Sequence, residues 1–320
     1  SPTETEIYTF PGSDAIFKLA KPVEADGVAS LVAKMKELKI DLCVAGEESY
    51  LVKDEGLANA CAVAGIPCWG PPKEAAQLEA SKEFAKEFMV RQAIPTGGYS
   101  SVETVEEAFE AIGGQYPTVL KFDGLAAGKG VAVCLTEQDA EAFLDEVLGQ
   151  RKFGGGRLLV EEYLEGPEIS IFASVVDGDY QILAPARDYK RIYDADEGPN
   201  TGGMGAVSSL EMFEGDLRKV IDETIVKPTV EGLQKEGLPY RGFLYFGLML
   251  TAQGPKVIEY NCRFGDPEAE AVLPMVVGDF AAHVFEGAKG ILNPDLITFK
   301  SGWSICLVSA SAGYPAGSRR

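Results

Sequence analysis

Residues 257–263 form a strand pattern that carries the groups expected of a cation site. Side chains on a strand alternate between its two faces, so Glu259, Asn261 and Arg263 share one side. A carboxylate and an amide oxygen at that spacing suit a hard cation such as magnesium, and the arginine suits a phosphate that the cation bridges. An apolar strand whose exposed face happens to be polar gives the same pattern, so both interpretations stay open here.

A glycine-rich loop between two strand patterns could cover phosphate groups. The first strand ends near Lys121, and Gly124, Gly128, Lys129 and Gly130 follow before the second strand begins. Glycines let backbone N–H groups approach an anion closely, and the two lysines add positive charge. The loop is not a Walker A motif, because Ser or Thr does not follow its lysine. An ordinary hairpin with a flexible tip is the alternative.

Two glutamates stand on either side of a turn that Gly166 and Pro167 predict. Glu161 closes an apolar strand, and Glu168 opens the next strand seven residues later. A carboxylate at the first position can accept a hydrogen bond from an adenine amino group, and one at the second can accept from ribose hydroxyls. Surface glutamates that flank a hairpin are the alternative. A further hairpin turn is predicted at residues 177–178.

A basic trio precedes a second glycine-rich loop. Arg187, Lys190 and Arg191 come shortly before residues 198–205, which read Gly-Pro-Asn-Thr-Gly-Gly-Met-Gly. Cationic side chains beside a backbone of this kind could hold a sugar phosphate. A polar surface loop is the alternative, and the density of glycine favours the binding interpretation.

The elements that must position these groups read as an α/β protein. Residues 40–69 alternate strand, helix and strand, which predicts a doubly wound parallel sheet at the N-terminal end. Helical patterns occupy residues 73–92, 102–112 and 137–148. Lys82 lies off the apolar face of the first of these helices, where most lysines are simply solvated.

Composition excludes several classes of function. The 320-residue chain has a formal net charge of −20, which disfavours a nucleic-acid partner. No apolar run is long enough for a membrane span, and the first residues lack a signal-peptide pattern. The six cysteines form no C-x-x-C pair and lie in apolar segments, which predicts reduced thiols in a cytoplasmic protein.

These motifs together resemble the ATP-grasp enzymes and, within them, the phosphoribosylamine–glycine ligase family. The resemblance covers nearly the whole chain. The sharpest matching segments are residues 81–86, 123–130, 198–205 and 261–268. Segments 123–130 and 198–205 together are highly specific to this family.

The resemblance implies a role for each matching residue. Lys82 and Lys121 would hold the ATP phosphates, under the loop that contains Gly128, Lys129 and Gly130. Glu161, the Leu164 backbone and Glu168 would bind adenine and ribose. Glu259 and Asn261 would ligate Mg²⁺ or Mn²⁺, and Arg263 with Lys121 would act on the transferring phosphoryl group. The implied substrate-contacting residues are Asp188, Lys190, Arg191, Asn200, Thr201, Gly202 and Gly203.

The resemblance also implies a reaction and a domain plan. Glycine would be activated by ATP as glycyl phosphate and joined to phosphoribosylamine, giving glycinamide ribonucleotide, ADP and phosphate for purine biosynthesis. The fold would be ATP-grasp, with a small mobile lid, in a monomer or weak dimer. The implied parts are an N-terminal domain (1–78) that lacks its first βα unit, a core (79–115 and 187–295), a lid (116–186) and the start of a truncated C-terminal domain (296–320).

The chain departs from the family pattern at two positions. Arg187 and Tyr189 stand where the family usually has Gln and His, and the single histidine, His283, lies in a distant helical pattern where a structural role is expected. Two rival functions therefore remain at this level. One is an ATP-grasp ligase or carboxylase with another acceptor, and the other is a non-catalytic nucleotide-binding protein.

Overall fold

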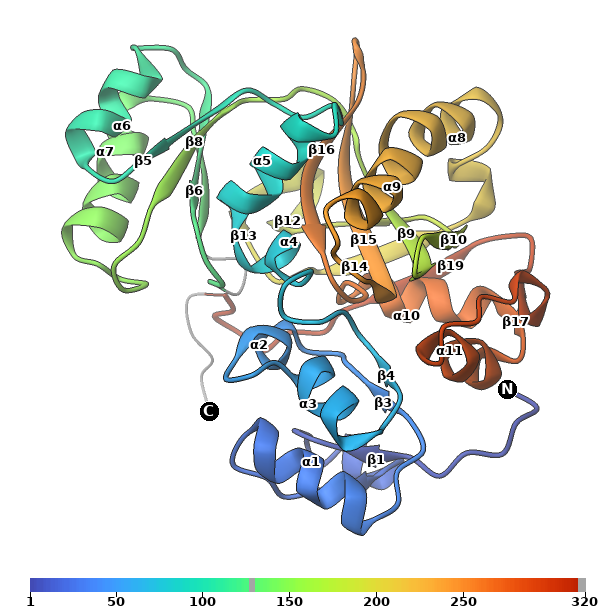
Figure 1. Cartoon of the computed structure of the whole chain (residues 1–320). Helices are drawn as coiled ribbons and strands as arrows, with labels where there is room; N and C mark the ends of the chain where they lie inside the picture. Colours follow the sequence, from blue (N-terminus) through green and yellow to red (C-terminus); the bar gives the residue numbers. More distant parts are fainter. Residues whose placement is uncertain (127–129, 316–320) are drawn as a thin grey trace.

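The computed structural model describes residues 1–126 and 130–315. Figure 1 shows an N-terminal unit, a small sheet with its own helices, and a large sheet that carries the remaining elements. Residues 127–129 and 316–320 lie outside the described part, so the predictions for Gly128 and Lys129 cannot be placed. No described helix has both the length and the apolar character needed to cross a bilayer.

The N-terminal unit contains two pairs of short parallel strands. β1 (Tyr8–Thr9) pairs with β2 (Lys21–Pro22), and β3 (Cys43–Val44) pairs with β4 (Cys68–Trp69). Helices connect or flank these strands, as the alternation of elements predicts, so the parallel arrangement is confirmed. The helices are α1 (Val28–Glu37), α2 (Glu48–Val52) and α3 (Leu57–Ala64), the last ending at Gly65 in the left-handed conformation.

The helical pattern after this unit is divided at Ser81. The structure has a short α4 (Gln77–Ala80) and then α5 (Lys82–Arg91), where the sequence predicted one helix over 73–92. Ser81 has extended backbone angles, and its hydroxyl accepts a hydrogen bond from the Phe84 N–H. A serine in this position satisfies one of the free donors at a helix start, so it begins a new helix and places Lys82 in the first turn.

The small sheet is antiparallel and contains β5, β8, β6 and β7 in that order. Its apolar side packs against α6 and α7, each of which begins with a Thr capping box. The element bounds are β5 (Tyr99–Val102), α6 (Val105–Ile112), β6 (Thr118–Phe122), β7 (Val131–Cys134), α7 (Glu137–Leu144) and β8 (Leu158–Glu162).

The limits of this sheet differ from the lid boundaries of 116–186 implied by the resemblance. β5 pairs with β8, so the small sheet already begins at Tyr99. At the other end, the strand that starts at Glu168 pairs with the large sheet. Strand pairing between distant segments sets the limits of the small sheet. The local sequence pattern predicts a strand but does not specify its partner.

The large sheet has seven strands, in the order β16-β15-β9-β11-β14-β19 with β10 paired to β9. The turn between β9 and β10 is the predicted hairpin, with positive φ at Asp177 (47°) and Gly178 (102°). The strands are β9 (Glu168–Val176), β10 (Asp179–Ile182), β11 (Ala186–Asp188), β14 (Gly205–Ser208), β15 (Arg241–Thr251), β16 (Gly254–Asn261) and β19 (Ser304–Leu307).

Alternation along β15 explains how helices cover both faces of the large sheet. Leu244 and Phe246 belong to a core shared with α5 and α9, whereas Phe243 and Tyr245 belong to a second core shared with α11. His283 on α11 is buried, with Nε2 2.8 Å from Ser174 Oγ, which agrees with its predicted structural role. The remaining elements are β12 (Arg191–Tyr193), β13 (Glu197–Asn200), α8 (Gly215–Ile221), α9 (Lys227–Lys235), α10 (Glu268–Val272), β17 (Val276–Gly278), α11 (Phe280–Ala288) and β18 (Ile297–Phe299).

Candidate nucleotide and metal site

Glu259 and Asn261 lie at the end of β16, beyond a bulge in its pairing with β15. The register pairs Gly247 with Glu259 but Leu248 with Val257, so Ile258 has no direct partner. The carbonyl of Ile258 accepts a hydrogen bond from Lys121 Nζ at 3.1 Å, which links the small sheet to the large one. A bulge of this kind re-aims the residues that follow it, and bulges are frequent beside active sites.

The charges around Glu259 are those that the sequence predicted for the site. Burial raises the pKa of Glu259, but Lys190, Lys121 and Lys82 more than offset this effect and hold the pKa below its ordinary value. Arg263 acts in the same direction. Four predicted cations from distant parts of the chain therefore keep one predicted metal ligand ionised.

The donor set at this strand end fits a hard cation that also binds phosphates. Glu259 offers a carboxylate and Asn261 an amide oxygen, both oxygen donors of the kind that Mg²⁺ prefers. On the neighbouring strand, a Cβ at Gly247 would lie 3.2 Å from Glu259 Cγ, so glycine gives the carboxylate room. Mg²⁺ commonly takes one or two protein ligands and completes its shell with phosphate oxygens and water.

Glu161 lies between two buried lysines, one of which the sequence analysis missed. Its Oε2 is 2.8 Å from Lys86 Nζ and 3.0 Å from Lys121 Nζ. Its Oε1 is buried and has no hydrogen-bond partner among the described residues. A buried acceptor of this kind fits an amino group such as that of adenine, because leaving it unmet is costly.

Lys86 also donates to the Thr96 hydroxyl and to the Gly97 carbonyl. Burial lowers the pKa of Lys86, while Glu161 favours its charged form. The sequence offered one weak signal for it, a lysine four residues after Lys82 in a helix with a buried face. Only the fold shows that this lysine points inward and contacts Glu161.

The start of the glycine loop is fixed to the first turn of α5. Asp123 Oδ1 accepts hydrogen bonds from the backbone N–H groups of Lys82 (2.6 Å) and Glu83 (3.2 Å). Lys82 Nζ in turn donates to the Gly124 carbonyl at 3.0 Å. A carboxylate at a helix N-terminus is stabilising. This contact brings Lys82 next to the loop, as its predicted phosphate role requires, and burial lowers its pKa.

Glu168, Asp188 and Lys190 form a second charged group at the start of β9. Lys190 Nζ is 3.6 Å from Glu168 Oε2 and 3.7 Å from Asp188 Oδ2. Burial opposes the charge on Lys190, but Tyr245 and Glu259, together with these two carboxylates, raise its pKa well above its ordinary value. Burial raises the pKa of Asp188, and the charge of Lys190 partly offsets this effect.

The loop that contains Asn200, Thr201, Gly202 and Gly203 is brought to the same region. The Thr201 hydroxyl donates to the Lys190 carbonyl at 2.8 Å and accepts from the Gly203 N–H at 3.0 Å. Gly203 has φ 126°, and a Cβ there would lie 2.3 Å from Pro267 Cδ, so the loop packs closely on the segment after β16. Arg191 donates to the Gly198 carbonyl across the β12–β13 pair.

Arg263 is held by two glutamates that were not predicted as site residues. Its Nε donates to Glu48 Oε2 at 3.1 Å, and its NH2 group lies 3.0 Å from Glu79 Oε1. Burial raises the pKa of Glu79 to about 7, while Arg263 and the Cys262 N–H favour its ionised form. Glu48 follows β3, so this contact joins the N-terminal unit to the end of β16.

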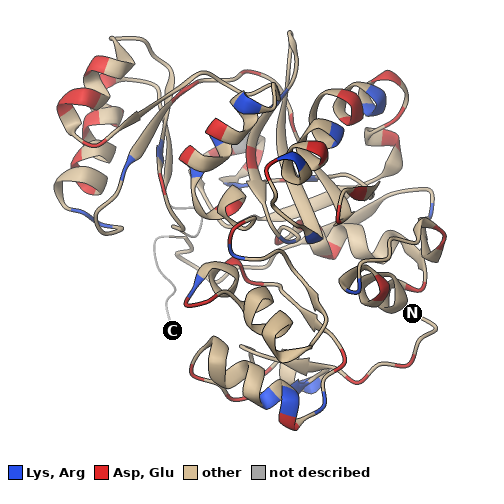
Figure 2. Ribbon diagram, viewed as in Figure 1, with Lys and Arg blue, Asp and Glu red and all other residues tan. Residues whose placement is uncertain are grey.

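The two positions that depart from the family pattern contact each other. The Arg187 guanidinium lies 5.5 Å from the centroid of the Tyr189 ring, and Tyr189 is 46% exposed. Their contact therefore lies toward the surface. Figure 2 shows acidic residues along α6 and α7, the two helices that cover the small sheet, and on many other elements.

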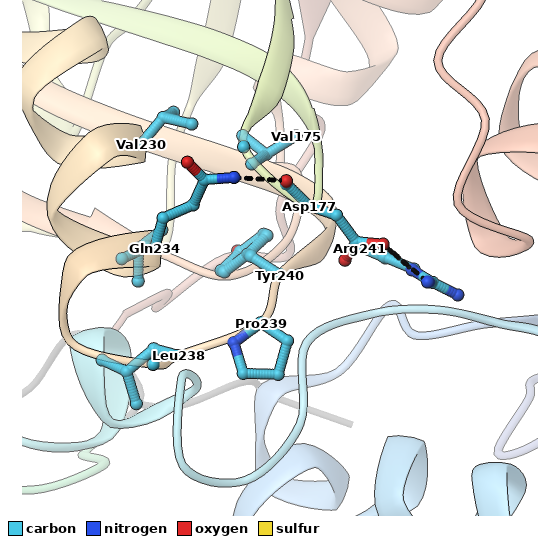
Figure 3. Close-up of a pocket in the computed structure, with 11 residues that line it drawn as sticks. Val175, Asp177, Val230, Gln234, Leu238, Pro239, Tyr240 and Arg241 are labelled. Carbon is cyan, nitrogen blue, oxygen red and sulfur yellow. Dashed lines mark hydrogen bonds and ion pairs between the residues drawn. The ribbon is translucent and has the colours of Figure 1, made fainter.

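A hollow of about 610 Å³ lies elsewhere, between α9 and the β9–β10 turn (Figure 3). Its lining includes Val230 and Tyr240 together with the Asp177–Arg241 ion pair, whose closest N–O distance is 2.6 Å. None of the predicted site residues lines it. The candidate site is therefore defined by converging charges and not by this hollow.

The chain matches two family models that together span most of its length. The model of the phosphoribosylglycinamide synthetase N domain covers residues 1–79, and the model of its ATP-grasp (A) domain covers residues 80–269. Both models describe one kind of protein, and they meet without a gap.

Curated relatives and solved structures agree with these models. The chain is 40% identical to phosphoribosylamine–glycine ligase of Caldanaerobacter subterraneus over 97% of this chain and 75% of the relative. It is 44% identical to the ligase of Caulobacter vibrioides, over 95% of this chain and 71% of that one. The solved ligase of Thermotoga maritima superimposes with a TM-score of 0.83 at 35% identity, covering 98% of this chain and 76% of that one.

A more distant structure shares the fold. Biotin carboxylase of Campylobacter jejuni, solved as a complex with an ATP analogue, superimposes with a TM-score of 0.73 at 20% identity, covering 93% of this chain and 68% of that one. The predicted ATP-grasp fold is therefore confirmed.

Proposed function

The chain belongs to the phosphoribosylamine–glycine ligase family of ATP-grasp enzymes, and we propose that it joins glycine to phosphoribosylamine at the expense of ATP. It is a ligase that forms a C–N bond and serves purine biosynthesis. The observation that carries the proposed site is the meeting of β6 with the end of β16, where Lys121 Nζ donates to the Ile258 carbonyl beside Glu259. Lys82, Lys190 and Arg263 also favour the ionised form of Glu259. Cations gathered around an ionised carboxylate suit a metal-bound polyphosphate.

The proposed reaction has two steps. A carboxylate oxygen of glycine attacks the γ-phosphorus of ATP, which gives glycyl phosphate and ADP. The amine of phosphoribosylamine then attacks the glycyl carbonyl and releases phosphate. The first step depends mainly on positioning and on neutralising charge, so lysines and an arginine suit it better than a catalytic triad.

Specific residues would position ATP for this reaction. Lys82 and Lys121 would bind its phosphates, and Gly130 before β7 would contribute its backbone; Gly128 and Lys129, also expected to bind ATP, lie outside the described residues. Glu161 Oε1 has no hydrogen-bond partner among the described residues, which supports a hydrogen bond from the adenine amino group. The Leu164 backbone borders the ring, and Glu168 accepts from the ribose hydroxyls.

Glu259 and Asn261 would hold Mg²⁺, or Mn²⁺ in its place. The cation would supply neutralisation of phosphate charge. Arg263 lies at the same strand end, where Glu48 and Glu79 hold its guanidinium, and it would act on the transferring phosphoryl group.

The acceptor substrate would occupy the neighbouring loops. Asp188, Lys190 and Arg191, with Asn200, Thr201, Gly202 and Gly203, would surround the substrates, and the close packing of Gly203 on Pro267 supports this placement. The free state of all six cysteines supports a reducing, cytoplasmic location. A monomer or weak dimer stays a prediction.

One assay tests the proposed function directly. Phosphate release from ATP is measured with glycine and phosphoribosylamine, and then with other amino acids, bicarbonate and other amines in place of each. Turnover only with the named pair supports the proposal. Turnover with a different acid or amine would identify another carboxylate–amine ligase, and no turnover with any pair despite ATP binding would identify a nucleotide-binding protein.

A further inference from the structure

Three cysteines from separate elements of the N-terminal unit bring their thiols together. Cys43 and Cys68 lie opposite each other on the parallel strands β3 and β4, and Cys61 comes from α3. Their Sγ atoms all lie within 4.8 Å of one another, and all three thiols are free. No other group of three His, Cys, Asp or Glu ligand atoms converges in this way in residues 1–126 and 130–315.

The geometry of the trio, which we call the thiol triangle, fits a single bound ion. Soft ions bind sulfur at about 2.3 Å, and three sulfurs at that distance around a pyramidal centre are roughly 3.5 Å apart. Sulfurs no more than 4.8 Å apart reach this spacing when each moves inward by roughly 0.8 Å, within the freedom of a cysteine side chain. The elements already present the three ligands to one point.

The surroundings limit which ion the thiol triangle can take. Cys43 and Cys61 belong to an aliphatic core with Val28, Leu31 and Ile66, where a net charge is costly. Three thiolates around a trivalent centre form a neutral complex, whereas a monovalent ion with three thiolates would bury two negative charges. Sulfur ligands also exclude the hard ions Mg²⁺ and Ca²⁺.

We propose that the thiol triangle is a binding site for a thiophilic trivalent ion, with arsenite as its best-matched ligand. The step balances without an oxidant: As(OH)₃ and three Cys–SH groups give As(S–Cys)₃ and three waters. Each thiol proton leaves on a hydroxide, and arsenic stays trivalent. Cys68 is partly exposed and gives the ion its point of entry.

The test uses the whole chain and sodium arsenite. Protein is incubated with arsenite and desalted, retained arsenic is measured by mass spectrometry, and X-ray absorption counts its sulfur neighbours. We expect one arsenic per chain with three sulfur neighbours, and a rise in Tm because capture ties β3, α3 and β4 together. Cys43→Ser, Cys61→Ser and Cys68→Ser should each lower retention at least tenfold.

Cys134→Ser is the matched control, because Cys134 is a fully buried cysteine of the small sheet outside the trio. This variant should retain arsenic like the parent. Where a trio variant fails to fold, alkylation of the folded parent followed by peptide mapping decides, since arsenite should protect Cys68, the partly exposed member of the trio. Equal retention in folded trio variants, fewer than three sulfur neighbours, or no retained arsenic would overturn the proposal.

Discussion

Two glutamates mark the two halves of the candidate site, and their surroundings differ. Glu161 on the small sheet is 6% exposed and forms direct ion pairs with Lys86 and Lys121. Four cations lower the pKa of Glu259 on the large sheet, yet Glu259 makes no ion pair within 4.0 Å with any residue that the structure describes. The first carboxylate is largely satisfied by the protein, and the second is ionised without a direct partner.

The difference separates two tasks that charged residues perform in one site. Direct pairing holds Glu161 in place and leaves one oxygen for recognition. Glu259 is ionised and has no ion-pair partner among the described residues, so its carboxylate stays available to a cation that arrives with the substrate. Removing charge at Glu161 should therefore affect stability first, and removing charge at Glu259 should affect turnover first.

The largest effect is expected when the buried charges of the small sheet are unbalanced. Glu161→Gln leaves Lys86 and Lys121 buried side by side without a counter-charge, which should lower the free energy of unfolding by about 3–5 kcal/mol. Lys86→Met leaves the Lys121–Glu161 ion pair, whose net charge is zero. It should lower the free energy of unfolding by about 1–3 kcal/mol, mainly because the groups that Lys86 contacted lose their hydrogen bonds. Guanidinium unfolding measures both.

An exposed pair provides the control for this comparison. Lys34 and Glu37 are 46% and 66% exposed, so replacing either by Met or Gln should change the free energy of unfolding by less than about 1 kcal/mol. If Lys86→Met costs as much as Glu161→Gln, then Glu161 is not the charge that balances both lysines.

The second prediction concerns the unpaired carboxylate of the large sheet. Glu259→Gln keeps an oxygen donor but removes the charge, so we expect kcat to fall by about 100-fold or more while the free energy of unfolding changes little. A higher Mg²⁺ concentration should be needed for half-maximal activity. Glu223→Gln, at an exposed position, should behave like the parent protein. An unchanged Mg²⁺ dependence in Glu259→Gln would remove Glu259 from the metal site.

The smallest of the three effects is expected at Glu168, where the chain passes from the small sheet to the large one. Glu168→Ala removes the carboxylate that would accept hydrogen bonds from the ribose hydroxyls, each worth about 1.5–3 kcal/mol. The affinity for ATP should fall by roughly 10- to 100-fold. Discrimination against 2′-deoxy-ATP should weaken in the same variant, because the group that senses the hydroxyl is gone.

Tripolyphosphate competition is the control for Glu168→Ala, since Lys82 and Lys121 are untouched and should bind the phosphates as before. A variant that binds ATP normally and still prefers it to the deoxy nucleotide would place the ribose elsewhere. That result would remove Glu168 from the ribose contact and would not affect the assignment of Glu161 to the adenine amino group.

Local rules in the sequence were sufficient for several features of this protein. Alternation along a strand put Glu259 and Asn261 on one face, because both lie beyond the bulge at Ile258. The Asp-Gly pair predicted the β9–β10 hairpin, because both residues tolerate positive φ. The strand–helix–strand order predicted the parallel pairing of β3 and β4.

Other features were decided only when distant segments met. Lys86 is a surface-type residue by sequence, yet packing against the small sheet buries it against Glu161, 75 residues later. Arg263 meets Glu48 and Glu79 only because the N-terminal unit and α4 pack against the end of β16. The boundaries of the small sheet and the convergence of the thiol triangle arise in the same way. Local sequence specifies backbone angles and which side chains of a strand share a face. The contacts named above depend on which elements pack together, and the packing of the whole hydrophobic core determines that.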